Sequence, residues 1–366
     1  MPVFDYAVVG AGVFGAWLAR TLHRLGRRVA LIDQYGPANA RASSGGESRI
    51  LRMGYGDREI YTQWSWRALS LYRSFYAAVD PSLLQPTGCL WLCRPEDAAT
   101  QATLSTLQRN RIPHEVLTSW ERFPFLSAPE GAVGIWEPDA AALLARRGVQ
   151  AVVRQSVREG LTYLQARAPE ALPEAGITIY ACGPWLPKLF PELLAGRIRA
   201  TRQEVLYFGT PPADPQWRPP HMPCWIDSTA SIYGIPDIEE RGFKLAFDVH
   251  GPEVDPDTQT RSVSTAFVEA ARLYLAQRFP LLANAPLLQA EVCQYENTAT
   301  GDYLIDRHPD NPRVWLLGGG SGHGYKHGPV IGEYLAAALE DGASIDPIFS
   351  LAVKKDYASG QRTSTI

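Results

Sequence analysis

The chain is poor in several features that would mark it for particular partners or environments. Its 366 residues include five cysteines, an odd number that argues against a disulfide framework and is typical of a reducing cytosol. A transmembrane helix needs about eighteen uninterrupted apolar residues, and no stretch of the sequence is that long. The net charge of −3 offers no attraction for nucleic acid or an anionic membrane. We therefore expect a cytoplasmic protein without nucleic-acid or membrane partners.

Other common signals are missing as well. The N-terminal apolar run lacks a preceding basic segment and is interrupted by glycines, so we expect folded structure there and no signal peptide. Internal repeats, low-complexity segments and long linkers are not visible. Cys89 and Cys93 lie in one strand-like run without a nearby histidine, which favours packed thiols over a metal site. We predict no metal.

What is present fits a globular enzyme of two domains. Hydrophobic residues make up 46% of the chain and aromatic residues 10%. A chain of this length exceeds what one simple core accommodates, so two domains are the starting expectation.

The first part of the chain has the pattern of a dinucleotide-binding βαβ unit. An apolar run ends in a glycine turn, a helical segment follows, and a second apolar run, Val29 to Ile32, ends at Asp33. Gly10, Gly12 and Gly15 have the spacing that permits a tight turn, close approach of a pyrophosphate, and close packing of helix on strand. Asp33 is placed to accept hydrogen bonds from a ribose.

Apolar periodicity predicts the remaining elements. Helices are expected over residues 60–76, 95–109, 140–158, 264–279 and 330–339. Strands are expected over residues 88–93, 134–136, 177–182, 204–208, 230–235, 243–247 and 314–317. The last strand runs into a second glycine turn, residues 318–324. The stretch 41–52 is too polar to be core and should cross above the bound cofactor.

Glycine turns near both ends of the chain predict a cofactor domain built from both ends. We expect an α/β fold in which a Rossmann-like, discontinuous domain covers residues 1–84, 139–200 and 293–366. A second, α+β domain covers residues 85–138 and 201–292, and its mostly antiparallel sheet roofs the cofactor and holds the substrate.

Five blocks of sequence together resemble the monomeric sarcosine oxidase family, which includes N-methyltryptophan oxidase and belongs to the D-amino-acid oxidase superfamily of flavin enzymes. Their order and approximate spacing match over nearly the whole chain; the blocks are GAGVFG with Asp33, SSGGESRILRMGYG, YGIPDIEERGFKLAF, VCQY and LIDRHPDNPRVWLLGGGSGHGYKHGPVIGE. The resemblance implies FAD, held in a glutathione-reductase-like fold. It also implies an oxidase that takes two electrons from a C–N bond and passes them to O2, forming hydrogen peroxide.

The resemblance further implies a set of FAD contacts. They are Gly10, Gly12, Val13, Phe14, Gly15, Asp33, Ser43, Ser44, Arg49, Cys182, Gly183, Trp185, Cys293, Gly320, Gly322, His323, Gly324 and Lys326. In the family, the cysteine equivalent to Cys293 carries the flavin through a thioether. Taken alone, such a cysteine is more often a buried free thiol.

Matching positions imply roles at the substrate site. Arg52 and Lys326 match the family's carboxylate-binding pair; the alternatives are a surface ion pair for Arg52 and a pyrophosphate contact for Lys326. Lys244 matches the lysine beside the flavin N5 that activates O2, although an isolated strand lysine more often faces solvent. Arg49 matches a residue at the flavin face whose charge favours the reduced ring.

Five more side chains are candidates for the expected site. Tyr233 and Tyr295 match the aromatic walls around the substrate. Tyr55 and His323 are further candidates, with ordinary packing as the alternative. Asp248 stands where sarcosine-oxidising relatives have a histidine, which places an acid near the amine and argues against sarcosine as the best substrate.

Two other departures from the family pattern affect the cofactor. Ser44 and Gly45 replace a histidine-containing turn, which weakens the case for covalent attachment, and the short connection over residues 158–177 predicts a trimmed FAD domain. The leading hypothesis is oxidation of a secondary amine or an N-alkyl or cyclic amino acid by FAD and O2, in a monomer or small homo-oligomer. The alternatives are a dehydrogenase with another electron acceptor and a non-catalytic flavin-binding subunit of a hetero-oligomer.

Overall fold

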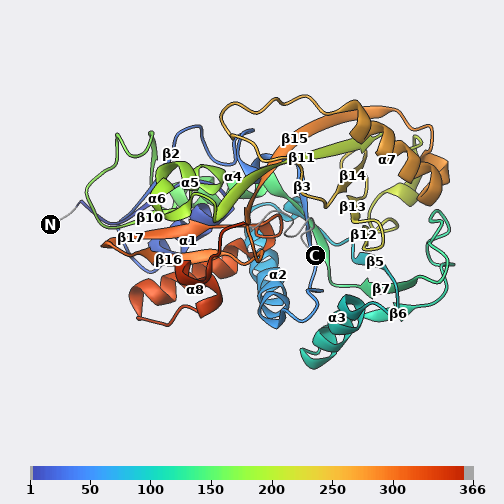
Figure 1. Cartoon of the computed structure of the whole chain (residues 1–366), viewed down its shortest axis with the longest axis horizontal. Helices are drawn as coiled ribbons and strands as arrows, with labels where there is room; N and C mark the ends of the chain where they lie inside the picture. Colours follow the sequence, from blue (N-terminus) through green and yellow to red (C-terminus); the bar gives the residue numbers. More distant parts are fainter. Residues whose placement is uncertain (1–2, 358–366) are drawn as a thin grey trace.

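A computed structural model of the chain describes residues 3–357, whose strands form three sheets (Figure 1). The six-stranded sheet has the order β16-β17-β10-β1-β2-β9. Its strands are β1 (Phe4–Val9), β2 (Val29–Asp33), β9 (Thr162–Gln165), β10 (Ala175–Tyr180), β16 (Leu304–His308) and β17 (Asn311–Gly318). Neighbours pair in parallel, apart from the antiparallel pair of β16 and β17. This sheet confirms the Rossmann-like expectation.

An eight-stranded sheet forms the second body and is mostly antiparallel, as expected. Its order is β15-β11-β14-β13-β12-β5-β7-β6, and β12 pairs with β5 in parallel. Its strands are β5 (Cys89–Cys93), β6 (Glu115–Leu117), β7 (Val133–Glu137), β11 (Ile198–Phe208), β12 (Cys224–Asp227), β13 (Ile232–Ile235), β14 (Phe243–Phe247) and β15 (Leu287–Thr298). Residues of α7 (Thr265–Arg278) join the same core as the buried side chains of β11, β12 and β14.

A small antiparallel sheet lies between these two bodies. It consists of β3 (Ser48–Leu51), β8 (Ala141–Leu144) and β4 (Leu84–Gln85). Strand β3 contacts both β13 of the large sheet and the turn before α8 (Gly328–Glu340). It therefore places the residues that follow the first βαβ unit at the junction of the two bodies.

The helices of the structure include one in every predicted range and two short ones, within residues 186–194, that were not predicted. They are α1 (Val13–Arg24), α2 (Glu59–Val79), α3 (Ala98–Arg109), α4 (Ala145–Arg158), α5 (Leu186–Leu189), α6 (Pro191–Leu194), α7 (Thr265–Arg278) and α8 (Gly328–Glu340). Among residues 3–357, no helix is long and apolar enough to cross a membrane.

The predicted helix over residues 140–158 is wrong at its start. Residues Ala141–Leu144 form β8, which pairs with both β3 and β4 before the chain enters α4. All four residues are buried. Tertiary pairing on two sides outweighs the helical pattern that the apolar residues share with α4.

The expectation that residues 41–52 are too polar for the interior is wrong for part of the stretch, although Arg41 is exposed. Ser44, Ser48 and Arg52 are each at most 7% exposed. Their polar atoms are tolerated because they are bonded; the Ser44 hydroxyl, for example, accepts from the backbone N–H of Val13 at 3.1 Å. Burying this stretch brings its cations beside the glycine turns.

The two long strands β11 and β15 extend from the α5 and α6 side of the molecule toward α7 (Figure 1). They pair from Ile198 opposite Thr298 to Phe208 opposite Leu287. The proposed domain boundaries at residues 200 and 292 fall within these strands. One strand pair thus carries residues of both the cofactor side and the substrate side.

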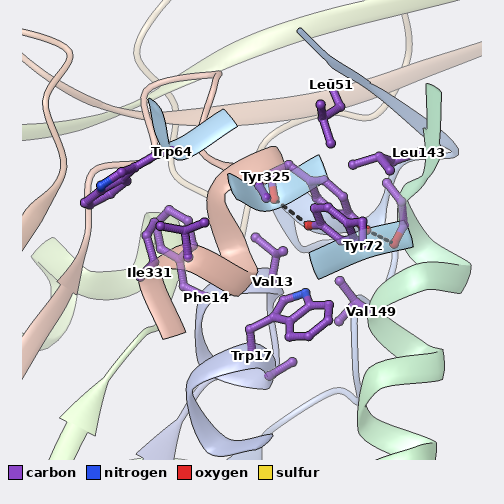
Figure 2. Close-up of a cluster of buried hydrophobic side chains, with 14 of the residues drawn as sticks. Val13, Phe14, Trp17, Leu51, Trp64, Tyr72, Leu143, Val149, Tyr325 and Ile331 are labelled. Atoms are coloured by element: carbon purple, nitrogen blue, oxygen red, sulfur yellow. Dashed lines mark hydrogen bonds between the residues drawn. The ribbon is translucent and has the colours of Figure 1, made fainter. Parts of the chain in front are cut away.

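The core beneath the glycine turns combines α1, α2, α4, α8 and the small sheet (Figure 2). Val13 and Trp17 of α1 lie close to α8, and the absence of a side chain at Gly328 permits this approach: a Cβ there would lie 2.6 Å from the Val13 side chain. The Tyr72 hydroxyl of α2 donates to the carbonyl of Tyr325 at 3.0 Å, which ties the second glycine turn to α2. The packing fixes both turns relative to each other.

Candidate functional site

Both glycine turns open into one cleft of about 610 Å³. This volume is within the range of small-molecule and cofactor sites. Of the predicted cofactor residues, its walls contain Gly10, Gly12, Val13, Phe14, Asp33, Ser43, Ser44, Arg49, Cys182, Gly183, Trp185, Gly320, Gly322 and Gly324. The fold therefore brings together segments that are more than 300 residues apart in sequence.

The first turn is shaped by glycines that no other residue could replace. Gly10 has φ +106°, and a Cβ there would lie 2.3 Å from the carbonyl oxygen of Ala181. A Cβ at Gly15 would lie 1.9 Å from the carbonyl oxygen of Gly10. Gly15 does not line the cleft; it lets α1 pack against the turn, so that the helix N-terminus faces the cleft.

Asp33 lies at the cleft and is already engaged by the backbone. Its carboxylate accepts N–H bonds from Ala11 at 2.8 Å, Tyr35 at 2.8 Å and Gly36 at 2.9 Å. Burial raises its pKa, against the lowering effect of these three bonds. A carboxylate offers about four lone-pair sites, so the side chain retains capacity for a ribose hydroxyl.

Two buried polar atoms on the cleft wall support occupancy by a dinucleotide. Ser43 Oγ and Glu296 Oε1 are buried and have no hydrogen-bond partner among the described side chains and backbone. Burial raises the pKa of Glu296 to about 7, although the N–H groups of Gly319 and Gly320 act to lower it. Such groups need partners, and the hydroxyl and phosphate groups of a dinucleotide could supply them. Sequence reasoning missed Glu296, which directly follows Tyr295.

A second cavity of about 70 Å³ adjoins the cleft and shares Arg49, Tyr295, Gly322 and Tyr325 with it. Its wall brings together six of the seven predicted catalytic residues, together with His323; the six are Arg49, Arg52, Tyr233, Asp248, Tyr295 and Lys326. Three of them are cations, so this cavity suits a small anion beside a bound cofactor.

Arg52 is buried, so the alternative of a surface ion pair is wrong. Its guanidinium lies between the rings of Tyr55 at 4.5 Å and Trp91 at 4.6 Å, and it donates to the carbonyl of Gly54. Glu137, which sequence reasoning missed, accepts from the N–H groups of Met53 and Gly54 and from the indole of Trp91. The Glu137 carboxylate therefore holds both the backbone that follows Arg52 and the Trp91 ring on which Arg52 stacks.

Lys326 reaches the same cavity from the second glycine turn. Its ammonium donates to the Tyr55 hydroxyl at 2.7 Å and to the His323 carbonyl at 3.3 Å. Burial, and then the charge of Arg52, hold the pKa of Lys326 well below its usual value. A carboxylate that enters the cavity would raise the pKa of Lys326 again and so stabilise its ammonium form.

Tyr55 and His323 belong to a buried hydrogen-bond network. His323 lies 2.9 Å from the Gly301 carbonyl through Nε2, and its Nδ1 faces the hydroxyls of Tyr303 at 2.8 Å and Tyr55 at 3.3 Å. Because Nε2 must donate to a carbonyl, Nδ1 accepts. Burial keeps the pKa of His323 well below its usual value, so the ring is neutral.

Lys244 is 1% exposed, and the alternative of a solvent-facing lysine is wrong. Its ammonium donates to the Ser48 carbonyl at 2.8 Å. Burial, with Arg49 nearby, lowers its pKa to about 7. It does not line the 70 Å³ cavity but a separate one of about 20 Å³.

Cys293 does not line the cleft itself but lies next to wall residues. Its sulfur is 3.8 Å from the Ser43 carbonyl and 4.0 Å from Nη2 of Arg49. Cys89 and Cys93, by contrast, are buried in β5 as free thiols.

Comparison with known proteins shows which family the chain belongs to. Residues 5–338 match the family DAO, described as FAD dependent oxidoreductase. The chain belongs to this family. The DAO assignment makes the protein an FAD-dependent oxidoreductase, and the cleft with its two unpartnered polar atoms fits FAD.

Relatives within the DAO family cover nearly the whole chain. Monomeric sarcosine oxidase of Streptomyces avermitilis is 28% identical, covering 95% of this chain and 96% of the relative. Peroxisomal sarcosine oxidase of Homo sapiens is 27% identical, and the match covers 96% of this chain and 95% of the relative. N-methyl-L-tryptophan oxidase of Yersinia pestis is 25% identical, and the match covers 95% of this chain and 99% of the relative.

Solved structures share the DAO fold at lower identity. L-proline dehydrogenase from P. horikoshii has a TM-score of 0.81 at 17% identity, covering 95% of this chain and 96% of that one. The amino acid oxidase NikD has a TM-score of 0.77 at 18% identity, covering 95% and 97%. These structures confirm the fold class.

Proposed function

We propose that the protein oxidises a secondary amine, or an N-alkyl or cyclic amino acid, with FAD and O2, and that it yields an imine or aldehyde and hydrogen peroxide. The observation that carries this proposal is the 70 Å³ cavity, in which Arg49, Arg52 and Lys326 meet beside the cofactor cleft. Relatives named as oxidases of sarcosine and of N-methyl-L-tryptophan support the substrate class.

The buried cations provide the substrate anchor. Arg52 is held rigidly by its two aromatic neighbours, and Lys326 is oriented by Tyr55, so a carboxylate can bond to both without ordering either side chain. Asp248 lies on the wall of the same cavity and attracts the ammonium of an amino acid. An acid at this position favours substrates other than sarcosine.

FAD supplies the acceptor for the hydride that leaves the carbon next to nitrogen. The chain's own residues orient and shield the reacting atoms: Tyr233 and Tyr295 wall the cavity and exclude water. The substrate amine loses its proton on binding or to water, since we assign no dedicated base. Lys244 provides positive charge for the reduction of O2, and Arg49 favours the reduced ring.

We include a thioether between Cys293 Sγ and the 8α-methyl carbon of the flavin in this proposal. Its formation would break the S–H bond and one C–H bond of the methyl group, and the two electrons and two protons released would pass to O2. The sulfur lies 4.0 Å from Nη2 of Arg49, a residue of the cofactor cleft wall. Acid denaturation of the purified protein should leave the yellow colour with the polypeptide, and Cys293→Ser should release it. Colour that leaves the wild-type chain would contradict the covalent link while leaving the oxidase proposal intact.

The main test is a substrate screen with the isolated, flavin-loaded chain. N-methyl amino acids, cyclic imino acids and primary amines are incubated in air, and peroxide is measured. The same panel is repeated without oxygen in the presence of a dye acceptor. Peroxide formation supports the oxidase; turnover with the dye alone would identify a dehydrogenase, and no turnover in either condition would favour the non-catalytic subunit.

A further inference from the structure

The small cavity beside Lys244 is distinct from the substrate cavity. It holds about 20 Å³ and is lined on its inner side by Ser48, Leu144, Tyr207, Pro236, Ile238, Gly242 and Lys244. About 10–15 Å³ is enough for a single water molecule. The space therefore suits a molecule of two or three atoms and excludes an amino acid.

Tyr207 and Lys244 are neighbours in this cavity because of strand register. They stand directly opposite each other in the antiparallel pair of β11 and β14, which places their side chains on the same face of the sheet with Cβ atoms about 5 Å apart. Tyr207 is 3% exposed. The register thus brings the two side chains to the wall of the same small cavity.

Both groups have hydrogen-bonding capacity to spare. The Tyr207 hydroxyl is buried and has no partner within residues 3–357. The Lys244 ammonium, which has three N–H donors, gives one to the Ser48 carbonyl. A buried hydroxyl without a partner is costly, and a small molecule in the cavity that accepts from it would remove that cost.

We propose that Tyr207 is a second catalytic residue of oxygen reduction, donating a hydrogen bond, beside Lys244, to O2 as it gains charge. The proposal rests on the oxidase function proposed above. An apolar O2 enters between Leu144, Pro236 and Ile238, and the anion formed from it is stabilised by the two donors in a low-dielectric site. Burial keeps the pKa of Tyr207 well above its usual value, so the phenol stays a donor throughout.

The reaction balances without net change at Tyr207. The amine gives up a hydride from carbon and a proton from nitrogen, which together are two electrons and two protons. O2 takes up the same two electrons and two protons to become hydrogen peroxide. Tyr207 begins and ends with its proton, and its role is confined to the hydrogen bond.

The outer wall of the cavity is made of ion pairs that are partly exposed. Arg147 pairs with Glu239 at 2.7 Å, and Arg241 pairs with Glu47 at 3.3 Å. Their side chains separate the cavity from solvent. The small cavity has no lining residue in common with the substrate cavity.

The test compares the two half-reactions of the flavin-loaded enzyme in Tyr207→Phe. We expect the second-order rate constant for reoxidation of the dithionite-reduced enzyme by O2 to fall about 10- to 100-fold, less than for a lone oxyanion-hole donor because Lys244 remains. Anaerobic reduction by the amine should change less than about twofold. Tyr163→Phe is the matched control, since its hydroxyl is also buried without a partner among the described residues but lies on β9.

The outcomes separate this inference from the oxidase proposal. Slow reoxidation of the wild-type enzyme itself would count against the oxidase. Fast reoxidation of both wild type and Tyr207→Phe would overturn the role of Tyr207 alone. Ile238→Phe, which fills the cavity and keeps the hydroxyl, provides a second variant and should also slow reoxidation but not reduction.

A crystal structure of the oxidised enzyme provides a measurement that does not depend on activity. We expect one ordered water, standing in for O2, within hydrogen-bond distance of both Tyr207 Oη and Lys244 Nζ, and no such water in Tyr207→Phe. A Tyr207 hydroxyl turned away from the cavity would overturn the proposal.

Discussion

Among single residues, burial of charge decides what this site can do. Lys244, Arg52 and Lys326 are at most 7% exposed. Charges in such surroundings are unfavourable unless polar or aromatic groups hold them. Lys244 is held by a carbonyl, Lys326 by a hydroxyl and a carbonyl, and Arg52 by two aromatic rings and a carbonyl.

The first prediction concerns Lys244 and pH. Because its pKa is lowered to about 7, the ammonium predominates below that pH and is lost above it. The rate constant for reoxidation by O2 should therefore fall as pH rises through about 7 and level off at high pH. Lys244→Met should be slower by about 100-fold or more at low pH and should show no such dependence. Stopped-flow reoxidation measures both; an unchanged rate in Lys244→Met would remove the lysine from oxygen reduction.

The second prediction concerns Arg52. Loss of a charged hydrogen bond to the substrate carboxylate costs about 1.5–3 kcal/mol, so Arg52→Ala should raise KM about 10- to 100-fold. Arg52→Lys is the matched control: it keeps the charge but cannot lie flat between Tyr55 and Trp91, and it should recover only part of the loss. Steady-state kinetics and flavin content are measured together. A normal KM in Arg52→Ala would show that another group anchors the carboxylate.

At the scale of elements, close approach between backbone segments shapes the cofactor cleft. The turn after β1 fits under Ala181 because Gly10 has no side chain, and α1 fits against the turn because Gly15 has none. Strand register is equally decisive in the large sheet, where it sets Lys244 opposite Tyr207. Element-level geometry therefore determines which side chains can meet.

Gly15→Ala tests the packing of α1 on the first turn. The added methyl would lie 1.9 Å from the carbonyl oxygen of Gly10, so the helix must shift away from the strand. We expect loss of most bound flavin, measured by the ratio of visible to ultraviolet absorbance, and a lower melting temperature. Gly26→Ala is the control, because it has φ +81° but no atom within 4 Å of the new methyl. It should lose some stability and keep its flavin. Full flavin content in Gly15→Ala would mean that the turn tolerates the shift.

For the whole molecule, the cofactor cleft joins two bodies. Its walls include Asp33 of β2 and Gly10, which follows β1, on the side of the six-stranded sheet, and Gln294 and Glu296 of β15 on the side of the eight-stranded sheet. A ligand that contacts both bodies stabilises their arrangement by mass action. FAD is therefore expected to act as a structural element as well as a reactant.

Removal of FAD tests this expectation. In Cys293→Ser, where the flavin can be dialysed away, the apoprotein should unfold at a lower temperature than the loaded protein. Added FAD should restore stability by about 4 kcal/mol at a free concentration about 1,000-fold above its Kd. Thermal melts at several FAD concentrations measure the effect. Melting that does not depend on FAD would show that the two bodies hold together without it.

The sequence by itself determined the local features: the glycine turn with Asp33, most helices and strands, and, through family resemblance, the cations of the site. These are readable because a tight turn, an amphipathic period and a motif each depend on neighbouring residues. Only the tertiary structure decided that residues 141–144 pair as a strand, that Ser44, Ser48 and Arg52 are buried, that Glu137 holds the backbone next to Arg52, and that Glu296 and Tyr207 line cavities. Those outcomes depend on strand pairing and burial between segments far apart in the chain, for which the local sequence carries no signal.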